Sequence, residues 1–70
     1  MIKFENKSNE RFYYLSVHCD ILAHTVLTAT RGGKNITVVS VIAKGNTEVI
    51  NKKILQITKL RLSRGYELVL

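Results

Sequence analysis

The sequence has no tryptophan, no proline and a single cysteine among its 70 residues. Because Cys19 has no second cysteine to pair with, an internal disulfide is impossible and no zinc-finger spacing exists. Two histidines and an aspartate lie near Cys19 in the sequence, but adjacent strand residues such as His18 and Cys19 point to opposite faces and do not reach one ion. We therefore predict no metal site and no cofactor.

Acidic residues are also scarce, since five Asp and Glu stand against eleven Lys and Arg, for a net charge of +6. The five carboxylates are scattered along the chain, and no pair of them is placed for acid–base work. Gly33 and Lys34 resemble the end of a phosphate-binding P-loop, but Asn35 stands where that loop needs Ser or Thr. The sequence therefore predicts a protein that binds and does not catalyse.

Long hydrophobic runs are absent as well, because none approaches the roughly 20 apolar residues that span a bilayer. Residues 1–6 are too polar for a signal peptide, so we expect a cytoplasmic protein without membrane association. With 46% hydrophobic residues, the chain is predicted to fold as one small domain over residues 1–70. Such a domain buries only about 60% of the surface of its unfolded chain.

Positive charge is abundant, and it is concentrated in the second half of the chain. Six basic residues and one acidic residue lie between Lys44 and Arg64. This distribution favours polyanions such as nucleic acid as partners. A solvated basic face that serves only solubility is the alternative, and the sequence leaves both open.

Residues 46–69 carry the clearest signal, that of a helix which runs into Arg64-Gly65-Tyr66-Glu67. Asn46 or Thr47 can cap the first turn with a side-chain oxygen. Gly65 follows a cationic last turn, at the position where a residue with positive φ commonly ends a helix. At about 100° per residue, one face of this helix is predicted to be apolar and to consist of Ile50, Ile54, Leu55, Ile57 and Leu62.

Arg61 interrupts that apolar face, because it projects between Ile54 and Ile57. We expect its methylene stem to cover apolar surface while its guanidinium reaches water or a carboxylate, such as Asp20 or Glu67. The sequence thus predicts a partly buried, partnered arginine.

The chain before residue 46 has the periodicity of strands. Residues 11–19 alternate, and one side of that strand, Tyr13, Leu15, Val17 and Cys19, is the predicted core side. Residues 25–30 and 36–43 are β-branched, and the glycines between them predict a hairpin.

The remaining segments complete the predicted fold. Residues 2–4 are expected to form a short edge strand, residues 5–10 a loop and residues 66–70 a last strand. Ile21 and Leu22 are expected to tuck under the sheet, since both are apolar. The predicted fold class is α+β, a small antiparallel β-sheet with a single helix packed on one face.

Three segments resemble the WGR domain, a small module of poly(ADP-ribose) polymerases and many bacterial proteins. Residues 11–22 resemble its opening strand with the aspartate that follows, residues 26–28 its second strand, and residues 54–67 its helix with the closing Gly-Tyr. Arg61 stands where the family has a basic residue four positions before that glycine. The Trp-Gly-Arg triplet is missing, and Arg31-Gly32-Gly33 stands near its place. The resemblance implies the fold of the family and, more weakly, nucleic acid as the partner.

Two functions are compatible with these patterns. In the first, DNA or another polyanion binds through its backbone phosphates to a basic hairpin and helix. The predicted contact set is Arg31, Lys34, Lys44, Lys52, Lys59 and Arg64, and the predicted structural residues are Tyr13, Arg61, Gly65 and Tyr66.

In the second, the chain is a protein-interaction or self-association module. Residues 36–43 are apolar on both faces, yet one helix covers only one face of a sheet. A host protein or a dimer partner would cover the other face. The N-terminal arm and the loop of Ile21 and Leu22 are further candidates for that role.

Overall fold

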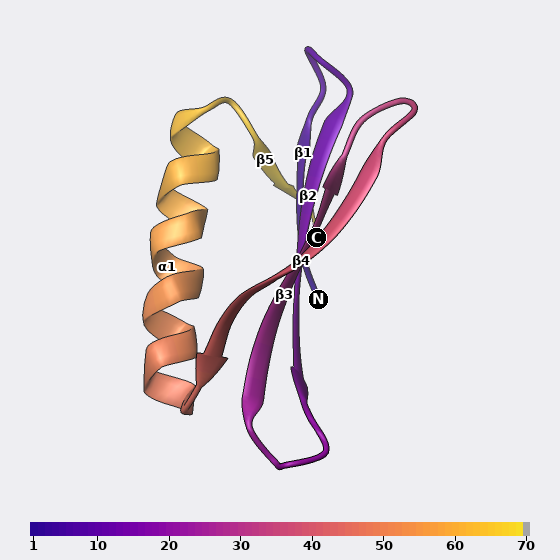
Figure 1. The fold of residues 1–70 in the computed structure, drawn as a ribbon. Helices are drawn as coiled ribbons and strands as arrows, with labels where there is room; N and C mark the ends of the chain where they lie inside the picture. Colours follow the sequence, from indigo (N-terminus) through magenta and orange to yellow (C-terminus); the bar gives the residue numbers. More distant parts are fainter. Residues whose placement is uncertain (70) are drawn as a thin grey trace.

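A computed structural model of the chain describes residues 1–69. Its elements in chain order are β1 (Ile2–Asn6), β2 (Arg11–Cys19), β3 (Thr25–Gly32), β4 (Thr37–Gly45), α1 (Thr47–Ser63) and β5 (Glu67–Val69). The five strands form one antiparallel sheet in the order β4-β3-β2-β1-β5, with α1 against one face (Figure 1). The α+β fold predicted from the sequence is thereby confirmed.

The three hairpins place the turns at two opposite ends of the sheet. The β1–β2 turn, the β3–β4 turn and the C-terminal end of α1 lie at one end (Figure 1). The β2–β3 turn lies at the other end, which is also where α1 begins. Residues that are far apart in the sequence therefore meet at the ends of the molecule.

The hydrophobic core lies between the sheet and α1. Side chains alternate across the pleat, and the register pairs Phe4 with Tyr13 and Leu15 with Ala29, so all four are on the helix side. The buried cluster consists of Phe4, Tyr13, Leu15, Leu27, Ala29, Ile50 and Ile57. Fully burying one such aliphatic or aromatic side chain stabilises the fold by about 1.5–3 kcal/mol.

Both ends of α1 are capped as the sequence predicts. At the start, the Oδ1 of Asn46 accepts a hydrogen bond of 2.9 Å from the backbone N–H of Val49. At the end, Gly65 has φ +87°, and the N–H of Tyr66 donates to the carbonyl of Arg61 at 3.1 Å. The N–H of Gly65 donates to the carbonyl of Leu62 at 3.3 Å. These two bonds form a Schellman motif, which turns Tyr66 back towards Arg61.

The predicted apolar face of the helix is too wide. Ile50 and Ile57 are buried and Ile54 packs against the core, but Leu55 and Leu62 are exposed. A single straight helix meets a sheet along one narrow strip, and these two leucines project outside it.

Three predictions about the strands are wrong. β1 is longer than expected and is not an edge strand, because β5 returns beside it and leaves β4 and β5 as the edges. Val17 and Cys19 are exposed, since the β2–β3 hairpin extends beyond the start of α1 (Figure 1). Ile21 and Leu22 do not tuck under the sheet either, and both are exposed.

The other predicted segments differ less from the structure. Of the expected loop over residues 5–10, the first two residues belong to β1. The predicted last strand is observed as Glu67–Val69, and residue 70 lies outside the described residues. Within residues 1–69, no helix combines the length and apolar character needed to cross a membrane.

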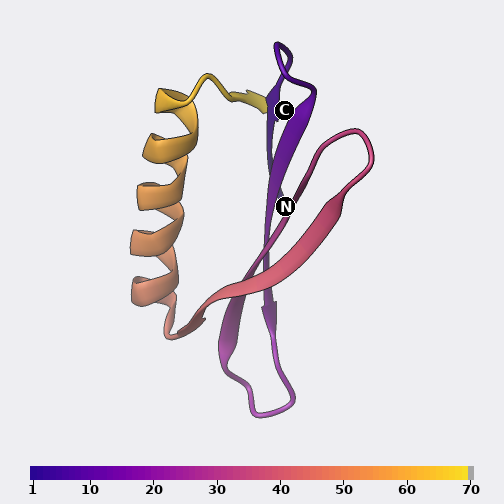
Figure 2. The same cartoon turned by 45° about the horizontal axis from the view of Figure 1, so that its top comes forward.

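The face of the sheet opposite α1 is covered by no other segment of residues 1–69, as Figure 2 also shows. The N-terminal arm is part of the sheet as β1, so it does not cover this face. Val39 and Val41 of β4 remain 64% and 65% exposed. On the same face, the rings of Phe12 and Tyr14 lie 4.8 Å apart.

Candidate anion-binding site

Arg61 is held between two tyrosine rings near the C-terminal end of α1. Its guanidinium carbon lies 4.0 Å from the ring centroid of Tyr13 and 5.5 Å from that of Tyr66. Tyr13 is only 5% exposed, so the cation–π contact is largely shielded from water and is worth about 1–2 kcal/mol. The Schellman motif brings the Tyr66 ring into place, which explains why Gly65 is required.

Neither of the two expected carboxylates, Asp20 or Glu67, pairs with Arg61. Asp20 pairs with Lys44 at the opposite end of the sheet, and Glu67 lies 3.8 Å from Lys7. The Nε of Arg61 is buried and has no hydrogen-bond partner within residues 1–69. Arg61 is therefore partly buried as predicted, but aromatic rings replace the expected carboxylate.

An open hollow of about 570 Å³ lies beside Arg61, between the end of the helix and the β3–β4 turn. Five cationic residues line it, and we call it the cationic hollow: Arg11, Arg31, Lys34, Arg61 and Arg64. No Asp or Glu of the described chain is among its lining residues. Its volume falls within the range of about 300–1,000 Å³ that is typical of ligand sites.

The β2–β3 register brings two of these arginines together. Phe12 pairs with Gly32 and Tyr13 with Arg31, so Arg11 lies beside Gly33, where a Cβ would stand 3.7 Å from its Cγ. The β3–β4 turn is closed by a 3.0 Å hydrogen bond from the N–H of Gly33 to the carbonyl of Ile36. That closure needs a glycine at position 32, because a Cβ there would collide with the same carbonyl oxygen.

A buried asparagine, Asn6, bonds to the backbone of Arg64, one of the residues that line the cationic hollow. Asn6 is 6% exposed, and its Nδ2 donates to the carbonyl of Arg64 at 3.3 Å. Its Oδ1 accepts bonds of 3.1 Å from the backbone N–H and 2.7 Å from the hydroxyl of Ser8. The β1–β2 turn is thereby bonded to the end of the helix, which orients the backbone that carries Arg64.

The structure divides the six predicted contact residues into three groups. Arg31, Lys34 and Arg64 meet at the cationic hollow. Lys52 and Lys59 line a separate groove on the outside of α1. Lys44 lies at the opposite end of the sheet, where it is ion-paired.

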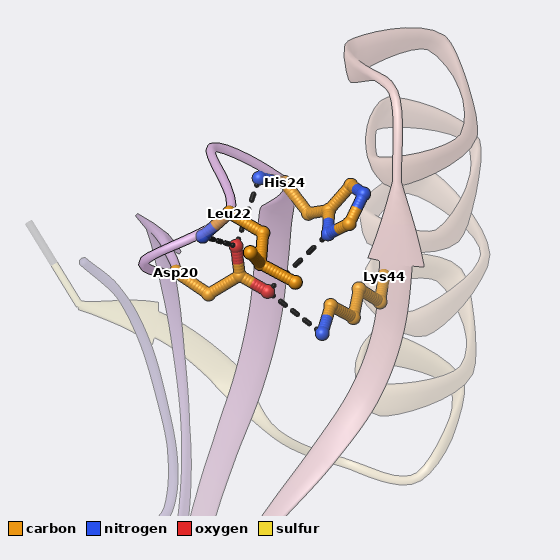
Figure 3. A network of polar contacts seen from close by, with 4 residues as sticks. All are labelled: Asp20, Leu22, His24 and Lys44. Carbon is orange, nitrogen blue, oxygen red and sulfur yellow. Dashed lines mark hydrogen bonds and ion pairs between the residues drawn. The ribbon is translucent and has the colours of Figure 1, made fainter.

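The ion pair of Lys44 belongs to a network around Asp20 (Figure 3). The Oδ2 of Asp20 lies 2.7 Å from the Nζ of Lys44 and 3.4 Å from the Nδ1 of His24. Its Oδ1 accepts backbone bonds of 3.0 Å from Leu22 and 2.9 Å from His24. Lys44 first, and then the two backbone donors, hold the pKa of Asp20 well below its ordinary value of 3.8. Asp20 thus both forms the turn and neutralises Lys44.

Sequence reasoning missed Arg11 as a member of the site. The signal was present in the register of the β2–β3 hairpin. Its turn is centred on Leu22 and pairs Cys19 with Thr25. The same register, continued to the far end of the hairpin, places Arg11 beside Gly33. Asn6 had a weaker signal. Asn followed two residues later by Ser suggests a local turn, but it does not reveal the distant helix as a partner.

The fold and this end of the sheet define a small α+β protein with a cationic hollow that no carboxylate of residues 1–69 lines. No protein-family model, curated protein or solved structure matches the chain.

Proposed function

We propose that this protein is a small non-catalytic binding module, similar to a WGR domain, that holds backbone phosphates of nucleic acid at the cationic hollow. The observation that carries the proposal is the lining of that hollow, which has five cations and, within residues 1–69, no carboxylate. Positive charges that the chain does not neutralise attract polyanions. The cytoplasmic location expected from the sequence is part of the same proposal.

The residue types at the cationic hollow suit phosphate. Four of the five cations are arginines, and the planar guanidinium matches two phosphate oxygens at once. Arg61 is already immobilised by Tyr13 and Tyr66, so it loses less side-chain entropy on binding. Contacts to backbone phosphates carry no base information, so binding is expected to depend little on sequence.

The likeness to the WGR domain supports the same partner. The helix ends in the Gly65-Tyr66 pair that the resemblance singled out, and Arg61, four positions before the glycine, lies at the cationic hollow. In this resemblance, Arg31-Gly32-Gly33 at the β3–β4 turn stands near the place of the missing triplet, and Lys34 follows it.

The test is fluorescence anisotropy with labelled duplex and single-stranded oligonucleotides over a range of salt concentrations. About three to five phosphate contacts give a log–log salt slope of about −3 to −4 on duplex DNA. The double variant Arg31→Ala with Lys34→Ala is expected to bind more weakly and to flatten that slope by about 1 to 2.

The matched control is Lys52→Ala with Lys59→Ala, which removes the same charge from the outside of the helix. It is expected to keep most of the affinity and the slope. Absence of binding at low salt, or equal losses for the two double variants, would refute nucleic-acid binding at the cationic hollow.

Self-association is the second candidate, and the exposed Val39 and Val41 on the uncovered face of the sheet favour it. Sedimentation at two protein concentrations tests it. A strictly monomeric protein would count against this candidate.

A further inference from the structure

We infer that the ligand of the cationic hollow is single-stranded nucleic acid, whose bases stack on an aromatic pair, Phe12 and Tyr14, on the uncovered face of the sheet. The inference rests on the proposed function, because the same strand places its phosphates at the cationic hollow. It adds a contact to the bases that phosphate binding alone does not require.

The first observation is the position of the aromatic pair. Phe12 and Tyr14 alternate along β2 with the core residues Tyr13 and Leu15, so their side chains lie on the face opposite α1. The two ring centroids are 4.8 Å apart, and the ring planes are inclined by 32°. Both residues are half-buried, and no other segment of residues 1–69 covers this face (Figure 2). The outward sides of the rings are therefore open to a ligand.

The second observation is that Phe12 joins the aromatic pair to the cationic hollow. Phe12 is one of the residues that line the hollow, and its ring contacts that of Tyr14. Its partner on β3 is Gly32, where a Cβ would stand only 3.1 Å from the Cζ of Phe12. The ring thus lies against the strand end that leads into the β3–β4 turn. The hollow and the aromatic pair form one continuous surface through Phe12.

The third observation is a cation on the other side of the pair. Lys3 pairs with Tyr14 across β1 and β2, and its Nζ lies 5.6 Å from the ring centroid of Tyr14. The lysine is exposed, so it can also meet a phosphate. A strand that crosses both rings therefore meets the cationic hollow beside Phe12 and a further cation beside Tyr14. Stacking rings bordered by cations are typical of surfaces that bind single strands.

Two carboxylates on the same face restrict the path of the strand. Glu5 pairs with Phe12 from β1, and Glu67 pairs with Glu5 from β5. The β3 partners of the two rings, Gly32 and Thr30, are uncharged. We therefore expect the phosphates to lie over β2 and β3 and not over β5.

A duplex fits the aromatic pair less well than a single strand. In a duplex the base faces are stacked on one another, and only the base edges are open in the grooves. The bases of a single strand can turn outwards and stack on aromatic side chains. Because every base has a π-face, such stacking tolerates any sequence. The phosphate contacts at the cationic hollow are open to both ligands, so the rings determine the preference.

A second copy of this chain is the competing occupant of the uncovered face. The exposed Val39 and Val41 would suit such a partner. Each copy carries a net charge of +6, however, and like charges at an interface oppose association. Nucleic acid carries the opposite charge, so charge complementarity favours the single strand.

The test is fluorescence anisotropy with three labelled probes: oligo(dT) of about ten nucleotides, an oligomer of the same length whose sugars carry no base, and a hairpin duplex. Oligo(dT) is expected to bind about tenfold or more tightly than the abasic oligomer, and more tightly than the duplex. The two single-stranded probes are expected to share one log–log salt slope, because they carry the same phosphates.

Two double variants of the aromatic pair separate the rings from their apolar bulk. Phe12→Leu with Tyr14→Leu keeps apolar side chains without π-faces, and is expected to bring the affinities for oligo(dT) and the abasic oligomer to within about twofold of each other. Phe12→Tyr with Tyr14→Phe is the matched control, since it exchanges the rings and keeps the composition. It is expected to retain the preference for oligo(dT).

Two further measurements complete the design. Circular dichroism and the thermal midpoint show whether each variant is folded. In NMR spectra, the ring protons of Phe12 and Tyr14 are expected to shift on addition of oligo(dT) and to shift less with the abasic oligomer, because only bases add a ring current.

The possible failures are distinguishable. Absence of binding by all three probes at low salt would refute the proposed function, and the inference with it. Equal binding of oligo(dT) and the abasic oligomer, with losses for both in Arg31→Ala with Lys34→Ala, would leave phosphate binding in place and overturn only the stacking.

Two other results would also overturn the inference. The first is tighter binding of the duplex than of oligo(dT). The second is a stable dimer in sedimentation that Phe12→Leu with Tyr14→Leu dissociates, because that result would assign the aromatic pair to self-association.

Discussion

At the β2–β3 turn, the Nζ of Lys44 lies 2.7 Å from the carboxylate of Asp20. At the opposite end of the sheet, five cations line the cationic hollow, and no carboxylate of residues 1–69 lines it. Both places join a hairpin turn to a neighbouring element. At the Asp20 end a carboxylate joins the turn to β4, and at the other end a buried asparagine and two tyrosine rings join the sheet to the helix.

The difference separates charge that stabilises the fold from charge that is free to bind. Asp20 satisfies two backbone donors and one lysine, so that end is electrostatically complete. The cationic hollow is held in shape by neutral groups: the rings of Tyr13 and Tyr66 hold Arg61, and Asn6 bonds to the carbonyl of Arg64. Apart from Arg61, which packs on two tyrosine rings, the cations of the hollow form no ion pair within residues 1–69 that would stabilise the fold.

Gly32→Ala is expected to have the largest effect, because it disrupts the wall of the cationic hollow. A Cβ at this position would collide with the carbonyl oxygen of Ile36, so the β3–β4 turn must shift. We expect the free energy of unfolding to fall by roughly 2–4 kcal/mol, as measured by urea denaturation, with loss of oligonucleotide binding.

Gly33→Ala is the matched control. A Cβ at position 33 would meet only the Cγ of Arg11, at the ordinary contact distance of 3.7 Å. Gly33→Ala is expected to lower the free energy of unfolding by less than about 1 kcal/mol. Similar losses for the two glycine variants would show that the turn is looser than described.

Arg61→Ala is expected to lower the free energy of unfolding by about 2 kcal/mol, because both its ring contacts and its packing are lost. Arg61→Lys keeps the charge but not the planar group, and is expected to recover only part of that loss. Arg64→Ala, which removes an exposed side chain, is expected to change stability by about 0.5 kcal/mol or less. An Arg61→Ala variant with the same free energy of unfolding as the wild type would contradict the structural role of the tyrosine contacts.

Local signals predicted much of this fold from the sequence. Asn46 and Gly65 mark the helix ends because capping depends on residues within one turn of each other. The strand Arg11–Cys19 has the predicted bounds, since alternation is also a local pattern.

Features that depend on distant contacts were not predictable in the same way. The partner of Arg61 is a tyrosine on β2, and helical periodicity cannot reveal that ring. Ile21 and Leu22 were expected to be buried because they are apolar, but the hydrogen bonds of Asp20 fix the turn with both side chains in solvent. The division of the predicted lysines between separate surfaces likewise depends on how the helix lies across the sheet.

Asp20→Asn tests the electrostatically complete end through its pH dependence. The folded protein holds the pKa of Asp20 below its ordinary value of 3.8, so the ionised form stabilises the fold. That contribution is fully present above pH 3.8 and is lost as the pH falls towards the depressed pKa. We therefore expect Asp20→Asn to be less stable than the wild type near neutral pH, with a gap that narrows in acid.

The measurement is urea denaturation of both proteins over a pH series. Glu48→Gln is the control, because its exposed pair with Lys52 at 3.7 Å is expected to contribute little at any pH. A difference between wild type and Asp20→Asn that does not change with pH would assign the effect to turn geometry and not to charge.

Leu22→Ser is expected to have the smallest effect, although it replaces a large apolar side chain by a polar one. Leu22 is 70% exposed, and its contribution to the turn is the backbone N–H that donates to Asp20 at 3.0 Å, which serine retains. We expect the free energy of unfolding to change by about 0.5 kcal/mol or less in urea denaturation. Leu15→Ala, at a buried position of the adjoining strand, is the contrasting case and is expected to cost about 2–5 kcal/mol. A loss of free energy of unfolding above about 1 kcal/mol for Leu22→Ser would mean that this turn is covered in solution. The Asp20 end of the sheet would then also have a partner.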